Sequence, residues 1–120
     1  MEAKILEFVF PTHTNALGTL FGGTLVAWIG KAAAFAIRRA RSVVVTASID
    51  SIDFKVPIKQ GDMAELTARV EKAGHTSLQV RVEVSREDPM DGSRELCTVG
   101  RPTMVALGKD GRPKALASPT

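Results

Sequence analysis

The sequence predicts an α+β fold in which a curved antiparallel β-sheet of about five strands wraps around one long central α-helix. The stretch 23–40 is apolar on nearly every side, and such a helix belongs inside a core. Most of the chain after residue 42 alternates between apolar and polar residues, which is typical of half-buried strands. One helix packed on one face of an antiparallel sheet satisfies both patterns.

Length and composition exclude several classes of protein. At 120 residues the chain is long enough for a single domain, 1–120, with a substantial core. Its net charge of +3 comes from scattered basic residues and it has no tyrosine, so no nucleic-acid partner is expected. The helix is too short, and too interrupted by Gly30 and Lys31, to span a membrane. Cys97 is the only cysteine, which excludes an intrachain disulfide and favours a cytoplasmic location.

The elements follow from breaks in these patterns. A first strand over 3–10 leads into a turn-rich loop at 11–22, and the helix over 23–40 would be roughly 27 Å long. The remaining strands are expected at 42–56, 63–72, 78–85 and 95–107, with a loose tail after about 108. The apolar positions of 42–56 change parity, which predicts a bulge near Asp50–Ser51. Pro102 requires an edge or a bulge in the last strand.

The alternation also predicts which side chains are buried. Trp28 and Phe35 of the helix are expected in the core. The strand residues predicted to face inward are Ala64, Leu66, Ala68, Val70, Leu78, Val80, Val82 and Val84. A single sheet leaves two unpaired edges, which favours a homodimer formed by edge pairing.

The loop before the helix is the strongest candidate for a functional site. Gly22 and Gly23 let a ligand approach the backbone closely, and the free N–H groups of the first helical turn form a ready anion or oxyanion site. Phe21 stands directly before this pair. Asn15, further upstream, can orient a water or a carbonyl group. The alternative is that Asn15 and Gly18 only adopt left-handed turn conformations.

Other residue types carry weaker signals. His13 is either a base or a residue that packs the loop. Thr76 and Ser77 either offer hydroxyl groups to a phosphate or belong to a plain turn. Asp50 and Asp53 fit solvated or bulge-capping positions, and Cys97 fits an inert buried thiol better than a nucleophile. Two histidines and one cysteine give no recognisable zinc spacing, so neither a metal nor a cofactor is expected.

A set of residues at characteristic spacing extends over most of the chain. They are Pro11, Thr14–Asn15, Gly18 to Gly23 (GTLFGG), Asp53–Phe54, Pro57, Gly61–Asp62, Thr76–Ser77 and Asp110 to Pro113 (DGRP). On these residues the sequence resembles the hotdog-fold acyl-CoA thioesterases, in the acyl-CoA hydrolase branch.

This resemblance implies hydrolysis of an acyl-CoA thioester to a free acid and CoA. It implies dimers that join two sheets edge to edge, and further assembly into dimers of dimers or trimers of dimers. Active sites would lie at the dimer interface, where Asn15 of one chain meets the central helix of the other.

The chain departs from the family at the acid of the helix. The Asp that serves the family as general base or nucleophile would fall at Gly30. Two hypotheses therefore remain: an acyl-CoA thioesterase whose base comes from His13, from a partner carboxylate or from no residue, and a hotdog protein that binds acyl-CoA without cleaving it. A third possibility is that the sequence is an altered form of an ordinary enzyme.

Overall fold

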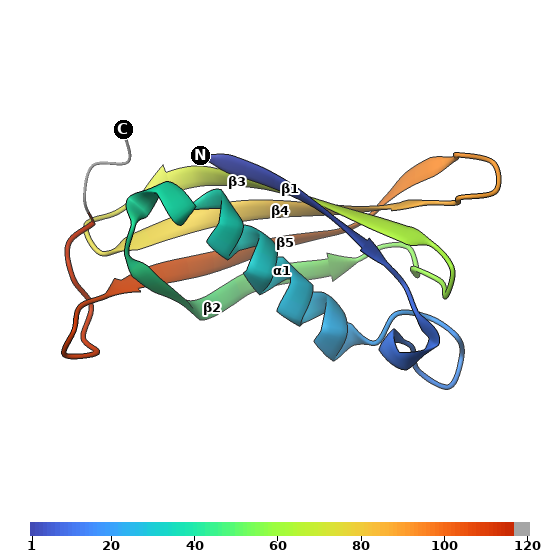
Figure 1. Ribbon diagram of the computed structural model, residues 1–120, viewed down its shortest axis with the longest axis horizontal. Coiled ribbons are helices and arrows are strands. Elements are labelled where there is room, and N and C mark those ends of the chain that lie inside the picture. The colour runs from blue at the N-terminus through green and yellow to red at the C-terminus, as the bar shows by residue number, and fades with distance from the viewer. Residues whose placement is uncertain (117–120) are drawn as a thin grey trace.

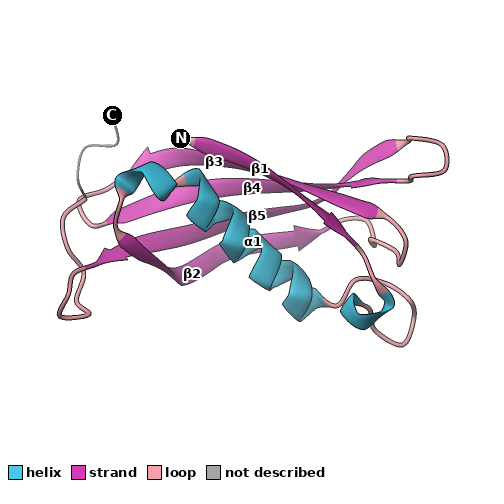
Figure 2. Cartoon of the chain, viewed as in Figure 1, coloured by secondary structure: helices cyan, strands magenta, loops and turns pink. Residues whose placement is uncertain are grey.

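The structure, a computed structural model, describes residues 1–116, with the side chain of Arg39 excepted. Its elements in chain order are β1 (Glu2–Phe8), η1 (Pro11–His13), α1 (Gly22–Ala36), η2 (Arg38–Ala40), β2 (Val43–Phe54), β3 (Met63–Ala73), β4 (Ser77–Glu87) and β5 (Arg94–Leu107). Figure 2 shows α1 lying diagonally across one face of the sheet. The predicted architecture of one helix on a five-stranded antiparallel sheet is confirmed.

The strand order β1-β3-β4-β5-β2 places β1 and β2 at the two edges of the sheet (Figure 1). All four pairings are antiparallel. Phe8 pairs with Met63, and Met63 pairs with Glu87, so the end of β1, the start of β3 and the end of β4 share one end of the sheet. The helix begins at this end, next to the loop that follows β1 (Figure 1).

The helix is shorter than the sequence predicts. α1 has 15 residues and ends at Ala36, so it is roughly 22 Å long. The cause is Ile37, which leaves the helical conformation (φ −104°, ψ 15°) while remaining buried. The tighter turn η2 follows, and Arg41 takes a left-handed conformation (φ 51°) that reverses the chain into β2.

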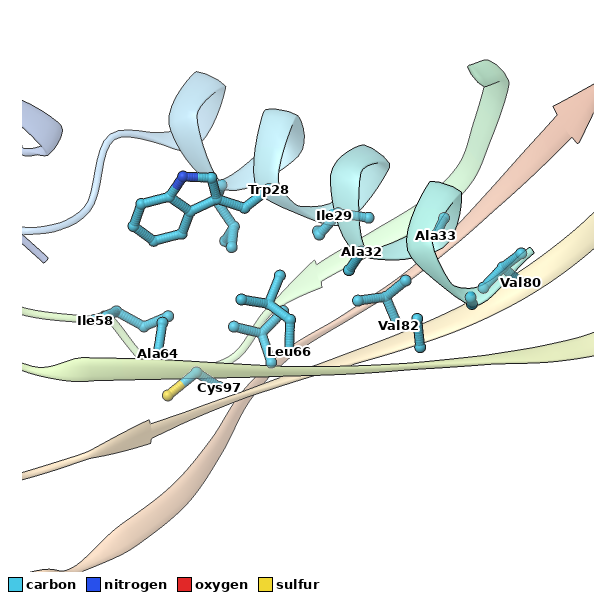
Figure 3. Packing of buried hydrophobic residues seen from close by; sticks show 14 of the residues in the cluster. Trp28, Ile29, Ala32, Ala33, Ile58, Ala64, Leu66, Val80, Val82 and Cys97 are labelled. Carbon is cyan, nitrogen blue, oxygen red and sulfur yellow. The ribbon is translucent and has the colours of Figure 1, made fainter. Parts of the chain in front are cut away.

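The core lies between α1 and the inner face of the sheet (Figure 3). The inward positions predicted for β3 and β4 are confirmed, with Val70 only partly buried, and Trp28 is buried as expected. The prediction for Phe35 is wrong, because its side chain is 47% exposed. The sheet covers only one side of α1, so the outer face of the helix stays open although its sequence is apolar.

Strand β2 contains the predicted bulge. Its register against β5 shifts between Ile49 and Ile52, around Asp50–Ser51, and shifts once more between Thr46 and Ser48. Pro102 lies in β5, an inner strand, and pairs with Ile49 of the edge strand β2 between these two irregularities. The bulges in β2 accommodate the proline.

The segment after β5 is not loose as far as it is described. Gly108 donates its N–H to the carbonyl of Arg112 at 2.8 Å, and Lys114 donates to Ala106 at 3.0 Å. Leu116 donates to His75 and packs against the core. The prediction of a loose tail is therefore wrong for 108–116, and residues 117–120 lie outside the described part. No helix in 1–116 is long and apolar enough to cross a membrane.

Candidate active site

The loop before α1 is held in one shape by the side chain of Asn15. Its Oδ1 accepts hydrogen bonds from the N–H of Leu17 (2.9 Å) and from the N–H and hydroxyl of Thr19 (3.2 and 3.1 Å). Gly18 has φ +76°, a left-handed turn conformation, whereas Asn15 does not adopt a positive φ. The left-handed interpretation thus holds for Gly18 and is wrong for Asn15. Within 1–116 nothing accepts a hydrogen bond from the amide nitrogen of Asn15, which remains a donor.

A second segment, 57–62, supports this loop from the other side. Leu20 donates its N–H to the carbonyl of Ile58 at 2.7 Å, and Gln60 donates to Gly18 at 2.9 Å. The carboxylate of Asp62 is buried, accepts the N–H of Lys59 at 2.8 Å and lies 3.7 Å from Nη1 of Arg86. The partner of Asp62 comes from β4, so this contact joins the segment 57–62 to the sheet.

The first turn of α1 leaves backbone donors free. Phe21 is the N-cap residue and makes no side-chain cap, while Leu25 donates its N–H to the carbonyl of Phe21 at 3.1 Å. In the described part of the chain nothing accepts the N–H groups of Gly22, Gly23 or Thr24. These groups carry the positive end of the helix dipole, which favours a negative oxygen.

The ring of Phe21 lies over the position that a side chain at residue 23 would occupy. A Cβ built on Gly23 would lie 2.8 Å from a ring carbon of Phe21, closer than real contacts allow. The ring itself is more than half exposed. The approach to the helix start is therefore narrow on this side and bordered by an aromatic face.

His13 packs the loop against the helix. Its Nδ1 accepts the N–H of Phe10 at 3.2 Å, and its ring stands edge-on to the ring of Trp28 with the centroids 5.1 Å apart. Its carbonyl accepts the N–H of Phe21 at 2.8 Å. A neutral imidazole that accepts at Nδ1 carries its proton on Nε2, so neither nitrogen is a free acceptor. This geometry favours the packing interpretation over the base.

A cleft of about 230 Å³ opens beside the helix start, and the sequence did not indicate it. Its walls come from the loop before α1, the first turn of α1, the end of β2, the segment 56–58 after it, and β5. The residues that line it are Thr19, Leu20, Leu25, Phe54, Val56, Pro57, Ile58 and Thr98. Four of the eight, Leu25, Val56, Ile58 and Thr98, lie outside the residues that carry the resemblance, and only the folded backbone brings all eight together.

Gly30 lies on the side of α1 that faces β2. A Cβ built there would lie 3.2 Å from Oγ1 of Thr46, whose hydroxyl also lies 3.4 Å from Sδ of Met104. The neighbouring Lys31 points elsewhere and forms an ion pair with Glu7 of β1. An acid at position 30 would thus meet a threonine hydroxyl and no cation from Lys31.

Other sequence candidates lie apart from the helix start. Thr76 and Ser77 stand at the β3–β4 turn, at the opposite end of the sheet from Gly22 (Figure 1). Asp53 lies 3.8 Å from the amine of Lys55 in an exposed pair, which agrees with a solvated role. Burial raises the pKa of the Cys97 thiol, so the inert interpretation is favoured. No cluster of three or more potential metal ligands occurs in 1–116.

Comparisons with known proteins agree on one family. A model of the thioesterase superfamily matches residues 17–93. A Bacillus subtilis protein named as an uncharacterised acyl-CoA thioester hydrolase is 43% identical, over 93% of this chain and 67% of its own length. A Zymomonas mobilis protein with the same description is 38% identical, over 93% of this chain and 76% of its own length.

Solved structures show the same relationship. A Staphylococcus aureus acyl-CoA hydrolase, solved in complex with butyryl-CoA, CoA and CoA disulfide, has a TM-score of 0.88 and 40% identity over 96% of this chain and 71% of its own. A hexameric acyl-CoA thioesterase has a TM-score of 0.89 and 43% identity over 96% of this chain and 74% of its own. The chain therefore belongs to the thioesterase superfamily, in the acyl-CoA hydrolase branch of the hotdog-fold thioesterases.

Proposed function

We propose that this protein hydrolyses acyl-CoA thioesters to a free acid and CoA. The observation that carries the proposal is that the N–H groups of Gly22 and Gly23 have no acceptor within residues 1–116, next to the loop that Asn15 holds in shape. The B. subtilis and S. aureus relatives, which bear the names of acyl-CoA hydrolases, support it.

In this proposal the thioester carbonyl binds at the start of α1. The N–H groups of Gly22 and Gly23 and the side-chain amide of Asn15 donate to its oxygen. Attack by water places a negative charge on that oxygen, and fixed donors stabilise this charge without reorganising. Because Oδ1 of Asn15 is already occupied by the loop, Asn15 acts on the carbonyl rather than on the attacking water.

The lack of an acidic side chain at residue 30 limits the rate of this reaction. Structures of the S. aureus enzyme include separate variants with an asparagine, an aspartate or a threonine replaced by alanine. In that enzyme the asparagine and the aspartate are separated by as many positions as Asn15 and Gly30 here. The comparison supports assigning Gly30 to the missing acid, with Thr46 as its nearest side chain. Without another base, water attacks slowly, since general acid–base help is worth roughly 10²–10⁴-fold.

We further propose that a complete site needs two copies of the chain. Strand β2 is an unpaired edge with exposed Val43, Val45 and Phe54, a surface suited to antiparallel pairing with a second β2. Such pairing brings Asn15 of one protomer towards Gly30 and Thr46 of its partner. Thr76 and Ser77, distant from the helix start of their own chain, then bind CoA phosphate from another protomer. The hexameric relative supports trimers of such dimers, and the lone Cys97 agrees with a cytoplasmic location.

A second candidate function follows from Gly30 itself: a protein that binds acyl-CoA without cleaving it. The two functions are separated by measuring CoA release from short, long and aryl acyl-CoAs, with wild type and Gly30→Asp. Release by the wild type supports the hydrolase. Release only by Gly30→Asp supports the binding protein, because the wild-type site would then lack only the acid at position 30. Release by neither variant, together with no binding of a non-hydrolysable acyl-CoA analogue, contradicts both.

A further inference from the structure

Arg86 stands one residue before the end of β4, at the end of the sheet where α1 begins. It pairs with Ala64 of β3, and cross-strand partners share a face, so its side chain starts from the face that holds the core. The side chain lies between two carboxylates, with Nη1 3.7 Å from Oδ2 of Asp62 and Nε 3.6 Å from Oε1 of Glu95. Glu95 of β5 thus holds Arg86 from one side, and Arg86 faces the turn before β3 (59–62) on the other.

Asp62 uses the same oxygen to hold this turn. Oδ2 accepts the N–H of Lys59 at 2.8 Å, and the N–H of Asp62 donates to the carbonyl of Lys59 at 3.0 Å. The turn is also anchored to the residue after β1, because Gly61 donates its N–H to the carbonyl of Val9 at 2.9 Å. Without Arg86 the carboxylate of Asp62, only 9% exposed, loses its counter-charge, and an uncompensated buried charge is costly. We expect the carboxylate then to rotate towards water and to release the N–H of Lys59.

The turn before β3 is bonded directly to the loop that contains Asn15. Gln60 donates its N–H to the carbonyl of Gly18 at 2.9 Å, and Lys59 forms a β-bridge with Thr19. Thr19 in turn donates its N–H and its hydroxyl to Oδ1 of Asn15. A shift of the turn is therefore passed to the side chain of Asn15 through a single residue, Thr19.

We propose that Arg86 is a positioning residue for the reaction: through Asp62 and the turn before β3, it fixes the direction in which the side-chain amide of Asn15 points. This inference rests on the proposed function, in which that amide donates to the thioester carbonyl. Fixed donors stabilise a transition state because they are already aimed at the developing charge. A misplacement of about 1 Å, caused by a change far from the reacting atoms, can cost about 10²-fold in rate. Arg86 itself touches no reacting atom and acts only through Asn15.

The first experiment measures hydrogen exchange of backbone N–H groups by NMR in the wild type and in Arg86→Gln. The N–H groups of Leu17 and Thr19 donate to Oδ1 of Asn15, so their exchange reports whether the loop keeps its shape. Both are expected to exchange about tenfold faster in Arg86→Gln, the effect of weakening one hydrogen bond. Unchanged exchange at both groups overturns the inference.

Arg94→Gln is the matched control. It also removes an ion pair at this end of the sheet, but its partner Glu65 lies on the outer face and not in the turn before β3. Exchange at Leu17 and Thr19 is expected to stay as in the wild type. An acceleration equal to that of Arg86→Gln would reflect a general loss of stability, and it overturns the inference.

The second experiment asks whether Arg86 acts through Asn15. CoA release is measured for Arg86→Gln, Asn15→Asp and the double variant, in whichever background of wild type and Gly30→Asp turns over faster. Arg86→Gln alone is expected to lower kcat/KM by about 10- to 10²-fold, mainly through kcat, because the donor acts on the transition state. Added to Asn15→Asp it should cost less than about twofold, since that variant has no amide left to aim. No fall in kcat/KM for Arg86→Gln, or full multiplication of the two effects in the double variant, overturns the inference.

Asp62→Asn is the second variant if Arg86→Gln does not fold. It keeps an acceptor for the N–H of Lys59 but offers Arg86 no charge, so the same pattern is expected with smaller effects. Hydrogen exchange needs no substrate, so the positioning and the proposed function fail separately. Absence of CoA release by both wild type and Gly30→Asp contradicts only the hydrolase, because exchange still decides whether Arg86 holds the loop of Asn15. CoA release together with unchanged exchange in the folded variant overturns only the positioning.

Discussion

Gly30 and Thr46 face one another across the gap between α1 and β2, with the Cβ position of residue 30 lying 3.2 Å from the threonine Oγ1. A side chain at position 30 therefore meets a hydroxyl group that can orient it. The contact is tight, so Thr46 must move by a few tenths of an ångström. Its exposure allows this movement.

We expect Gly30→Asp to raise kcat for acyl-CoA hydrolysis by roughly 10²–10⁴-fold, because it restores general-base help. The helix should tolerate the change, since Gly and Asp are both poor helix formers. The measurement is the rate of CoA release at saturating acyl-CoA. Gly30→Asn is the matched control, with the same shape and no base. Equal rates in the two variants would show that no carboxylate acts at this position.

Asn15→Asp separates the two uses of the Asn15 side chain. The carboxylate still accepts the loop hydrogen bonds from Leu17 and Thr19, but the donor to the substrate is lost. We expect kcat/KM to fall by about 10²–10³-fold, the effect of removing one oxyanion donor, with little change in melting temperature. The assay background is whichever of wild type and Gly30→Asp turns over faster.

Asn15→Ala provides the comparison, because it removes the loop acceptor as well as the donor. Its melting temperature should fall below that of Asn15→Asp, while its activity is no higher. A fully active Asn15→Asp would mean that the side-chain amide does not contact the reacting carbonyl.

Local patterns predicted most of the fold because they repeat along the chain. Period-two alternation placed Leu66 and Val82 in the core, and the change of parity located the bulge at Asp50–Ser51. The exposure of Phe35 could not be predicted, since an apolar sequence does not reveal which face of a helix lacks a covering layer. The end of α1 at Ala36 depends on Ile37 turning into the core, which is also a tertiary effect.

The candidate site was predictable only where glycine marked it. Gly22 and Gly23 stand where the apolar helical pattern begins, so free N–H groups could be expected there. The cleft could not be expected, because its walls come from separate segments of the chain. Asp62 looks like a surface turn residue in sequence, and its burial depends on Arg86, a contact made by a distant strand.

Asp62 should contribute to stability far more than its turn position suggests. Its buried carboxylate accepts the N–H of Lys59, and replacing it with alanine leaves that donor unpaired. We expect Asp62→Ala to lower the free energy of unfolding by about 2 kcal/mol, the size of a hydrogen bond to a charged group. Urea denaturation followed by circular dichroism measures this change.

Asp53→Ala is the control for Asp62→Ala, because Asp53 is exposed and its pair with Lys55 is long. Its effect should stay within about 0.5 kcal/mol. Asp62→Asn should fall between the two, since its amide oxygen still accepts from Lys59 but carries no charge for Arg86. Equal stabilities of all three variants would contradict a structural role for Asp62.

Glu65 on the outer face of the sheet gives the protein a predictable acid response. Burial alone would raise the pKa of Glu65, but Arg94 at 2.6 Å and Lys4 at 3.5 Å outweigh it and hold the pKa below its ordinary value. A lowered pKa in the folded state stabilises the fold above the unfolded pKa of about 4.3, and this contribution is lost as the pH falls through the folded pKa. Glu65→Gln should therefore cost about 1 kcal/mol at pH 7, and this cost should shrink as the pH falls below the unfolded pKa and through the lowered folded pKa. Glu83→Gln removes a more exposed pair, with Arg81 two residues away on the same strand, and should cost less at pH 7. A cost for Glu65→Gln that is independent of pH in urea denaturation would show that the carboxylate charge does not stabilise the fold.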